Sequence, residues 1–262
     1  SDDFYNNKQY YSNMNIHTTG TVTMVGFVDV TGNINIGYDR EGNKISTGAV
    51  EADSTLTAEN GDILIGSETN RSASALLKDQ ITAATGVVIY TAGNVESDKG
   101  ILAKGTDVSA LVTTGGLVQP KVLGNIIIND SGVDSKITLK GTTTVGSTDD
   151  TKDDITLYGD KMDLEGDVTT NSNTGVVTVS NYKVGNTIDL GSTGDDVIGT
   201  LALSDAEIDK ITASKLVVGN NTSGTATKNI NITNAITPAG TSIVHMYTGV
   251  KDGKIYEDPN GN

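Results

Sequence analysis

The chain is a succession of very short apolar runs separated by turn signals, and this regularity restricts the fold more than any other feature. Most runs hold three to five residues, with β-branched or aliphatic side chains at alternate positions and Thr, Asn or Asp between them. That alternation is typical of a strand with one buried face. The short apolar runs, many of which carry it, are Val22–Val25, Ile34–Ile36, Ile63–Ile65, Val87–Tyr90, Ile126–Ile128, Ile137–Leu139, Ile155–Leu157, Val176–Val179, Ile188–Leu190, Leu201–Leu203, Leu216–Val218 and Ile230–Ile232.

The turn signals are as regular as the runs. Gly-Asn, Gly-Asp or Asn-Gly pairs bracket many of them, as at 32–33, 60–62, 93–94 and 124–125. Gly accepts a positive φ without a steric clash, and Asn tolerates it better than most residues. The sequence therefore predicts a sharp turn after each strand, with these residues supplying the left-handed backbone.

The strand pattern favours an all-β fold, a right-handed parallel β-helix (β-solenoid), over its alternative, a β-sandwich. A sandwich usually has longer strands and an aromatic core, whereas this chain has 2 Phe and no Trp. With roughly 20–25 residues in each coil and about 4.8 Å between coils, we expect about ten to thirteen coils and a rod roughly 50–60 Å long. The rod is predicted over residues 16–246, between an N-terminal Tyr-rich end segment, 1–15, and a C-terminal tail or cut end, 247–262.

One stretch has helical rather than strand character. Residues 204–211 begin with Ser204-Asp205-Ala206-Glu207, a capping box, and predict one or two helical turns. A weaker helical candidate covers residues 75–81.

Charge and composition exclude several function classes. With 18 basic and 33 acidic residues the net charge is −15, which opposes binding to nucleic acid and docking on anionic lipid. No apolar run is long enough for membrane insertion, and the absence of Cys excludes disulfides and thiol chemistry. The start at Ser1, with no charged-then-apolar leader after it, predicts a mature form or an excised piece of a longer protein.

Acidic loops are the candidates for a metal site. Ca²⁺ takes six to eight oxygen ligands from such loops, although solvated turn residues explain them equally well. The weak Ca²⁺ candidates are Asp149, Asp150, Asp153, Asp154, Asp195 and Asp196. No other cofactor is indicated.

No pattern indicates a catalytic centre. The chain has neither a Gly-x-Ser-x-Gly elbow nor a phosphate-binding glycine loop, and its carboxylates are too numerous to single out a pair. We therefore expect no enzyme activity. The enzymatic alternative is a carbohydrate-active β-helix, a lyase or a tailspike-like hydrolase.

Aromatic residues gather at the two ends of the chain. Three interpretations are open. The aromatic residues cap open edges of the strand ladder, they join one subunit to the next by strand addition, or the two ends are arbitrary cuts in a longer chain. The possible assembly contacts are Phe4, Tyr5, Tyr10, Tyr11, Tyr247 and Tyr256.

Residues 199–237 resemble a known family. The run from Gly199 to Gly219 contains Leu-Ser-Asp-Ala-Glu-Ile-Asp-Lys-Ile-Thr-Ala, followed by Ile230-Asn231-Ile232-Thr233 and a closing Ala235-Ile236-Thr237. It is similar to repeats of large bacterial β-solenoid adhesins, such as filamentous haemagglutinin and other type V-secreted passengers, except that Lys210 replaces their usual Arg. The resemblance implies a strand–short helix–strand coil and an exported, acidic surface protein, with no catalytic residue.

Together these features predict a structural or adhesive β-solenoid rod on the extracellular face of a bacterial cell. Its expected partners are host or neighbouring-cell surface molecules or glycans. The aromatic residues at the chain ends suggest an alternative function, a self-assembling extracellular filament or surface layer. In that case the partner is a second copy of the chain.

Overall fold

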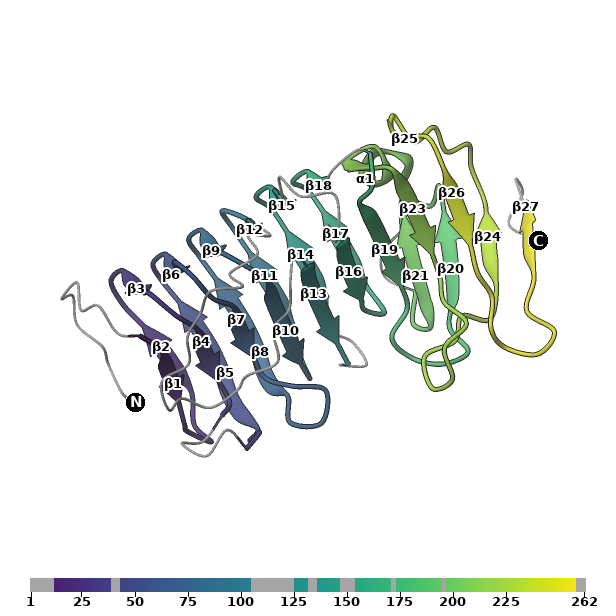
Figure 1. Ribbon diagram of the computed structural model, residues 1–262. Coiled ribbons are helices and arrows are strands. Elements are labelled where there is room, and N and C mark those ends of the chain that lie inside the picture. Colours follow the sequence, from purple (N-terminus) through teal and green to yellow (C-terminus); the bar gives the residue numbers. More distant parts are fainter. Residues whose placement is uncertain are drawn as a thin grey trace.

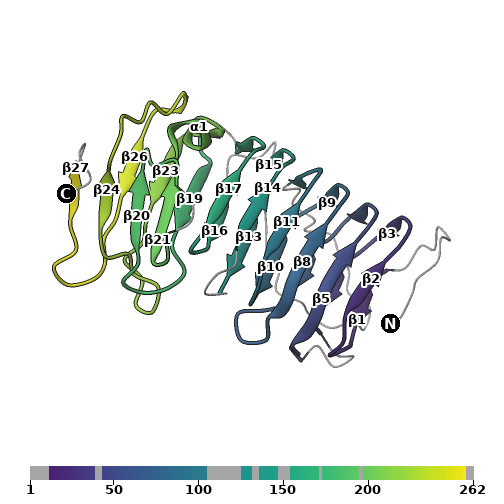
Figure 2. The same ribbon diagram turned by 180° about the vertical axis from the view of Figure 1, so that it is seen from behind.

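The computed structural model describes residues 12–38, 43–104, 125–131, 136–146, 154–170, 173–194 and 197–257. They form an elongated β-solenoid, with successive coils stacked from the N-terminal end to the C-terminal end (Figures 1 and 2). Every strand-to-strand ladder among these residues is parallel, so the predicted β-solenoid is confirmed and the β-sandwich alternative is wrong.

The first row of strands runs the length of the rod. Its nine members pair in chain order, and each belongs to the next coil. They are β1 (Met14–Ile16), β4 (Ile34–Ile36), β7 (Ile63–Ile65), β10 (Val87–Thr91), β13 (Asn125–Asp130), β16 (Asp154–Tyr158), β19 (Val176–Ser180), β23 (Lys215–Val218) and β26 (Val244–Met246).

The second and third rows form the other two faces of the coils. The second row is β2 (Val22–Met24), β5 (Thr47–Ala52), β8 (Ser72–Leu77), β11 (Val95–Ser97), β14 (Ile137–Leu139) and β17 (Met162–Leu164). The third row is β3 (Val28–Val30), β6 (Leu56–Ala58), β9 (Ile81–Ala83), β12 (Ile101–Ala103), β15 (Thr143–Val145), β18 (Val168–Thr169), β22 (Ile211–Ala213) and β25 (Gly240–Thr241).

Near the C-terminal end a fourth row replaces the second. It is formed by β21 (Thr200–Leu203), β20 (Thr187–Leu190), β24 (Ile230–Ile232) and β27 (Ile255–Glu257), paired in that order. One coil thus contributes two strands, β20 and β21, to the same row. The short helix α1 (Asp205–Ile208) connects β21 to β22 and makes the predicted capping box.

The coils are longer and fewer than predicted. Equivalent positions are 20 residues apart between Met14 and Ile34 but 39 apart between Val87 and Ile126. Nine described levels at about 4.8 Å give a stack about 40 Å long rather than 50–60 Å. The estimate failed because the corners hold insertions of unequal length. Strand pairing also reaches Met14 at one end and Glu257 at the other.

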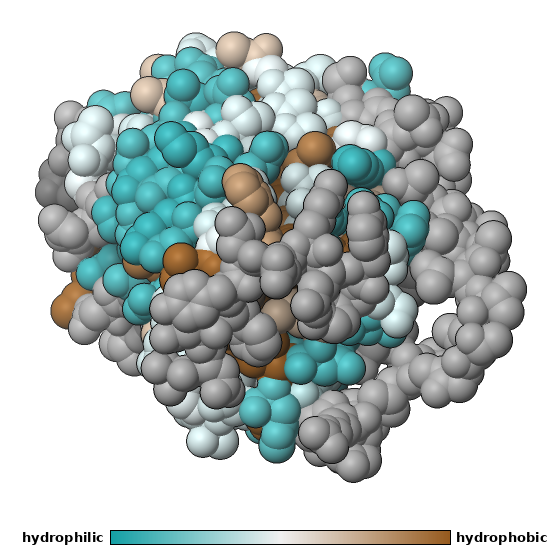
Figure 3. Space-filling view, turned by 90° about the vertical axis from the view of Figure 1, so that its left-hand side faces the viewer, coloured by the Kyte–Doolittle hydropathy of each residue, from teal (hydrophilic) through white to brown (hydrophobic). Residues whose placement is uncertain are grey.

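The interior is built from aliphatic ladders. In the first row Ile34, Ile63 and Val87 stack in register, as do Ile36, Ile65 and Ile89, and all six are fully buried. Burying one such side chain contributes about 1.5–3 kcal/mol. Hydrophilic residues cover most of the described surface seen from the N-terminal end (Figure 3).

The helix predicted weakly for 75–81 is wrong. Ala75 and Leu77 lie in β8, whose alternating burial places both side chains in the core, and Ile81 begins β9. Backbone pairing with β5 and β11 on either side is available to this segment and satisfies its N–H and C=O groups.

The Asn residues of the turns act differently from the prediction. No described Asn has a positive φ. Instead, an Asn or Asp just before a strand, or at its first position, accepts a hydrogen bond from the backbone N–H of the equivalent residue one coil later, a contact here called an inter-coil cap. The caps are Asn13 to Asn33 (2.8 Å), Asn33 to Asp62 (2.9 Å), Asp62 to Gly86 (3.0 Å), Asn94 to Lys136 (3.0 Å), Asp154 to Val176 (3.1 Å) and Asn229 to Lys254 (3.1 Å).

The Gly residues of the turns act in two ways. Gly66 has a φ of +66°, as the turn prediction requires. Gly61 has no positive φ, but a Cβ there would lie 2.7 Å from the backbone carbon of Gly32 in the preceding coil. Close stacking of the coils, rather than backbone handedness, requires glycine at that position.

Candidate functional site

Most of the predicted Ca²⁺ ligands lie outside the described residues. These are Asp149, Asp150, Asp153, Asp195 and Asp196. Asp154 is described, and its Oδ1 makes the inter-coil cap to the Val176 N–H. Within the described ranges, no three His, Asp or Glu side chains are grouped so that they could hold a metal ion.

The predicted assembly contacts divide in the same way. Phe4, Tyr5, Tyr10 and Tyr11 lie outside the described residues. Tyr247, directly after β26, and Tyr256, in β27, both belong to the last coil and are 41% and 37% exposed.

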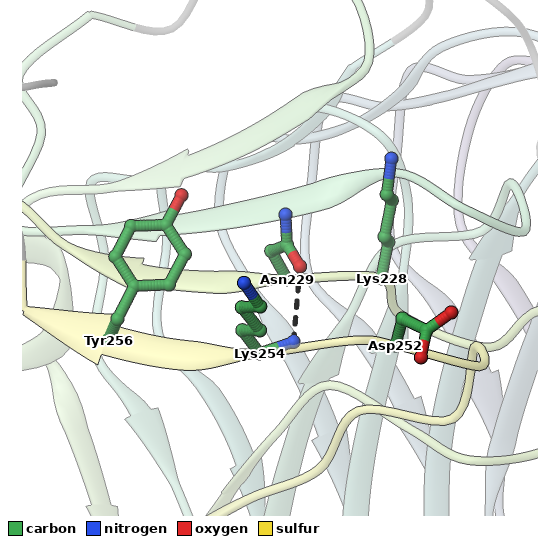
Figure 4. Close-up of a pocket in the computed structure, with 5 residues that line it drawn as sticks. All are labelled: Lys228, Asn229, Asp252, Lys254 and Tyr256. Atoms are coloured by element: carbon green, nitrogen blue, oxygen red, sulfur yellow. Dashed lines mark hydrogen bonds between the residues drawn. The ribbon is translucent and has the colours of Figure 1, made fainter.

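The last two coils also line a hollow in the described surface. Its volume is about 530 Å³, and the described residues that line it are Lys228, Asn229, Asp252, Lys254 and Tyr256. Figure 4 shows the side chains of Lys228, Asn229 and Tyr256 extending to the same side of the backbone, with Lys254 between them.

The strand register produces this grouping. Ile230 pairs with Ile255, so Asn229 and Lys254 occupy equivalent positions before β24 and β27. Alternation then places the side chains of Lys254 and Tyr256 on the outer side of β27, because Ile255 follows the inward ladder of Ile188 and Ile230.

The inter-coil cap orients the amide of Asn229. Its Oδ1 accepts the hydrogen bond from the Lys254 N–H at 3.1 Å, which directs Nδ2 away from the backbone and toward the hollow (Figure 4). A side chain that holds two coils together therefore also presents a donor to the outside.

Asp252 occupies the turn below the hollow with a φ of +66°, the one positive φ of a described residue other than Gly. The Gly253 N–H donates to the Val250 carbonyl at 2.9 Å and closes the turn. Asp is among the few residues that adopt this conformation readily. The turn thereby brings a carboxylate to the rim of a site otherwise lined by donors and an aromatic ring.

A second cluster, around Arg71, differs because its cation is already bound within the protein. The guanidinium carbon lies 5.3 Å from the ring centre of Tyr90 and 4.9 Å from that of Tyr182. Nη1 donates to the Thr91 carbonyl at 3.1 Å and Nη2 to the Tyr182 Oη at 3.2 Å. These contacts join coils far apart in sequence, which gives Arg71 a structural role.

Of the residues that line the hollow, only Tyr256 was predicted from the sequence. The other lining residues could have been found from the spacing between coils. Two apolar runs begin 25 residues apart, at Ile230 and Ile255, and Lys228-Asn229 and Lys254 directly precede them. The second run was not recognised as a strand, so the register between the two runs could not be predicted.

Comparisons with known proteins add no relative. No protein-family model, no curated protein and no solved structure matches the chain. Among the described residues, no helix is both long enough and apolar enough to cross a membrane.

Proposed function

We propose that the chain is a structural and adhesive rod of an exported bacterial surface protein, which holds ligand-binding surface at a distance from its base. The observation that carries the proposal is the continuous first row, nine parallel strands extending through the described rod. Stability in such a stack comes from nearest-neighbour coils, so length can be built without one central core. The resemblance of residues 199–237 to β-solenoid adhesin repeats and the acidic surface support the same function.

Adhesion of immobilised protein tests the proposal. Beads coated with the 262-residue chain are passed over bacterial cells, epithelial cells and glycan-coated surfaces, and the retained beads are counted. The control beads carry an unrelated acidic protein at equal density, because a net charge of −15 alone changes non-specific retention. Retention above the control on at least one surface is expected, and equal retention on every surface contradicts adhesion.

A filament is the second candidate, and the exposed last coil favours it. Ile243, Tyr247 and Ile255 are 47%, 41% and 47% exposed on strands or turns with no following coil in the described chain. A second copy could add its strands to this edge. One residue opposes the filament. Glu257 pairs in register with Ile232, so a charged side chain occupies an inward-facing position of the edge onto which a second copy would stack.

Light scattering and negative-stain microscopy at micromolar concentration separate the two candidates. A filament predicts fibres that Ile255→Lys abolishes, because the new charge disrupts the stacking edge. Single short rods for both the wild type and the variant contradict the filament.

A further inference from the structure

The hollow between the last two coils holds two lysines that no other described residue neutralises. Four other lysines make ion pairs with nearby carboxylates: Lys78 with Asp53, Lys136 with Asp163, Lys140 with Glu96 and Asp98, and Lys210 with Asp167. Lys228 and Lys254 make no side-chain hydrogen bond or ion pair with any described residue. Two free ammonium groups therefore line one hollow.

The segment around the hollow is less acidic than the chain as a whole. Residues 228–257 contain three Lys against one Asp and one Glu, a balance of +1 in a chain of net −15. This segment therefore repels an anionic ligand less than the net charge of the whole chain would suggest.

The donors form one set. The ammonium groups of Lys228 and Lys254 and the oriented Nδ2 of Asn229 supply N–H donors to the same side of the coil (Figure 4). Hydrogen bonds from ammonium groups to a carboxylate or phosphate are the stronger kind. The set suits an anionic group with more than one oxygen acceptor.

Two further side chains narrow the ligand class. Asp252 adds a carboxylate, which repels a bare anion but accepts hydrogen bonds from hydroxyl groups. Tyr256 adds a partly exposed ring whose face can pack on the apolar side of a sugar and whose hydroxyl can donate or accept. A ligand that carries a carboxylate and hydroxyls on one ring satisfies all five side chains.

We propose that this hollow binds an acidic saccharide, a sugar unit bearing a carboxylate. The carboxylate lies between Lys228 and Lys254, a hydroxyl donates to Asp252, and the ring packs on Tyr256. This assignment names a ligand class for the adhesive function proposed above and rests on it.

Calorimetric titration of the full chain with hexagalacturonate, at low ionic strength, tests the site. The variant K228Q/K254Q removes both cations, and K99Q/K104Q removes two exposed lysines elsewhere with the same change in net charge. We expect binding to weaken about tenfold or more in K228Q/K254Q and to stay within about twofold of wild type in K99Q/K104Q. Equal weakening in both variants, or no binding by wild type, overturns the site.

Three further titrations distinguish an acidic saccharide from a neutral saccharide and from a simple anion, and test the role of the tyrosine ring. Maltohexaose has hydroxyls without carboxylates, and its failure to bind supports the acidic-sugar assignment; binding equal to that of hexagalacturonate overturns it. If inorganic phosphate displaces hexagalacturonate at equal concentration, the acidic-sugar assignment is overturned and the hollow is a simple anion site. Tyr256→Leu is expected to weaken hexagalacturonate binding several-fold without lowering the Tm, and unchanged binding removes the ring from the site.

The same variants keep this proposal apart from the proposed function. If the coated beads adhere and K228Q/K254Q beads adhere equally well, the rod is adhesive and the hollow is not its ligand site. If hexagalacturonate binding requires both lysines while the beads adhere to no surface, the site stands and the adhesive function fails.

Discussion

The N-terminal section of the rod, from β1 to β18, and the C-terminal section, from β19 to β27, are built by the same stacking, yet they differ in what fills and closes each coil. In the N-terminal section each coil supplies one strand to each of three rows, and aliphatic ladders are fully buried. In the C-terminal section a single coil carries an additional strand and a helix, and Ile255 and Tyr247 of the last coil are 47% and 41% exposed. The ladder is fully buried where a coil lies on both sides, whereas the last described coil is stacked on one side only.

The largest expected effect on the free energy of unfolding comes from the same substitution, Ile to Ala, made in each of the two sections. Ile89→Ala removes a fully buried member of the first-row ladder, and we expect it to lower the free energy of unfolding by about 2–5 kcal/mol. Ile255→Ala removes the same atoms from a 47% exposed position and is expected to cost less than about 1 kcal/mol. Urea denaturation followed by circular dichroism measures both values. Similar losses would mean that the last coil is packed as tightly as the centre.

The polar corner of the C-terminal section gives the next effect. Asn220 is buried, and its Nδ2 donates to the Ser180 Oγ at 2.7 Å and to the Thr225 carbonyl at 3.0 Å. Its Oδ1 accepts from the Thr222 N–H at 2.9 Å. Asn220→Ala is expected to lower the free energy of unfolding by about 1–3 kcal/mol, because it leaves buried groups unpaired.

The matched variant for the N-terminal section is Asn33→Ala, which removes one inter-coil cap. A loss of about 0.5–1.5 kcal/mol is expected from the same denaturation curves. If Asn33→Ala proves the more damaging of the two, the caps rather than the corner network dominate polar stabilisation.

A smaller effect is expected at the helix inserted into the C-terminal section. The Ser204 Oγ accepts from the Glu207 N–H at 3.3 Å, and the Glu207 Oε2 accepts from the Ser204 N–H at 2.8 Å. Ser204→Ala is expected to lower the free energy of unfolding by about 1 kcal/mol, and Ser204→Thr, which keeps the hydroxyl, by less. Identical losses in thermal melts of the two variants would show that the capping hydroxyl contributes nothing.

The smallest effect is a pH dependence. Burial raises the pKa of Tyr38, Tyr90 and Tyr158 above the ordinary value of 10, with a further rise at Tyr38 from neighbouring Tyr90. In the unfolded chain these phenols ionise near pH 10, while the folded protein keeps them neutral to higher pH. The stability they contribute is therefore fully present below about pH 10 and is lost as the pH rises through their folded pKa.

Urea denaturation at pH 8, 9, 10 and 11 measures this loss. The variant Y38F/Y90F/Y158F is the control, because it retains paired lysines such as Lys78, whose raised pKa also makes stability fall at high pH. A shallower decline is expected for the variant, and parallel curves would contradict a contribution from the three tyrosines.

Much of the local structure could be predicted because it depends on neighbours in the sequence. The short apolar run Ile63–Ile65 and the alternation in Ile137–Leu139 predict the two strands, and the order of Ser204 and Glu207 predicts the helix start. Ala75–Ile81 was misassigned because its apolar spacing fits a helix as well as a strand, and only the neighbouring strands β5 and β11 decide between them.

The candidate site was only partly predictable. The sequence predicts Tyr256 as a possible contact residue because it is an aromatic residue near the end of the chain. It does not single out the other residues that line the hollow. Lys228 and Lys254 are 26 positions apart, and nothing local to either indicates the other.

By itself, the sequence determined that this protein is a stack of short half-buried strands with an aliphatic interior, because side-chain alternation and turn chemistry act over a few residues. The tertiary structure decided the register between coils, and the register decided the rest: the Asn and Asp side chains that cap the next coil, the glycine that leaves room for it, and the lysines that share one hollow. These contacts join residues 20 to 42 positions apart, through corners of unequal length, so only the folded stack specifies them.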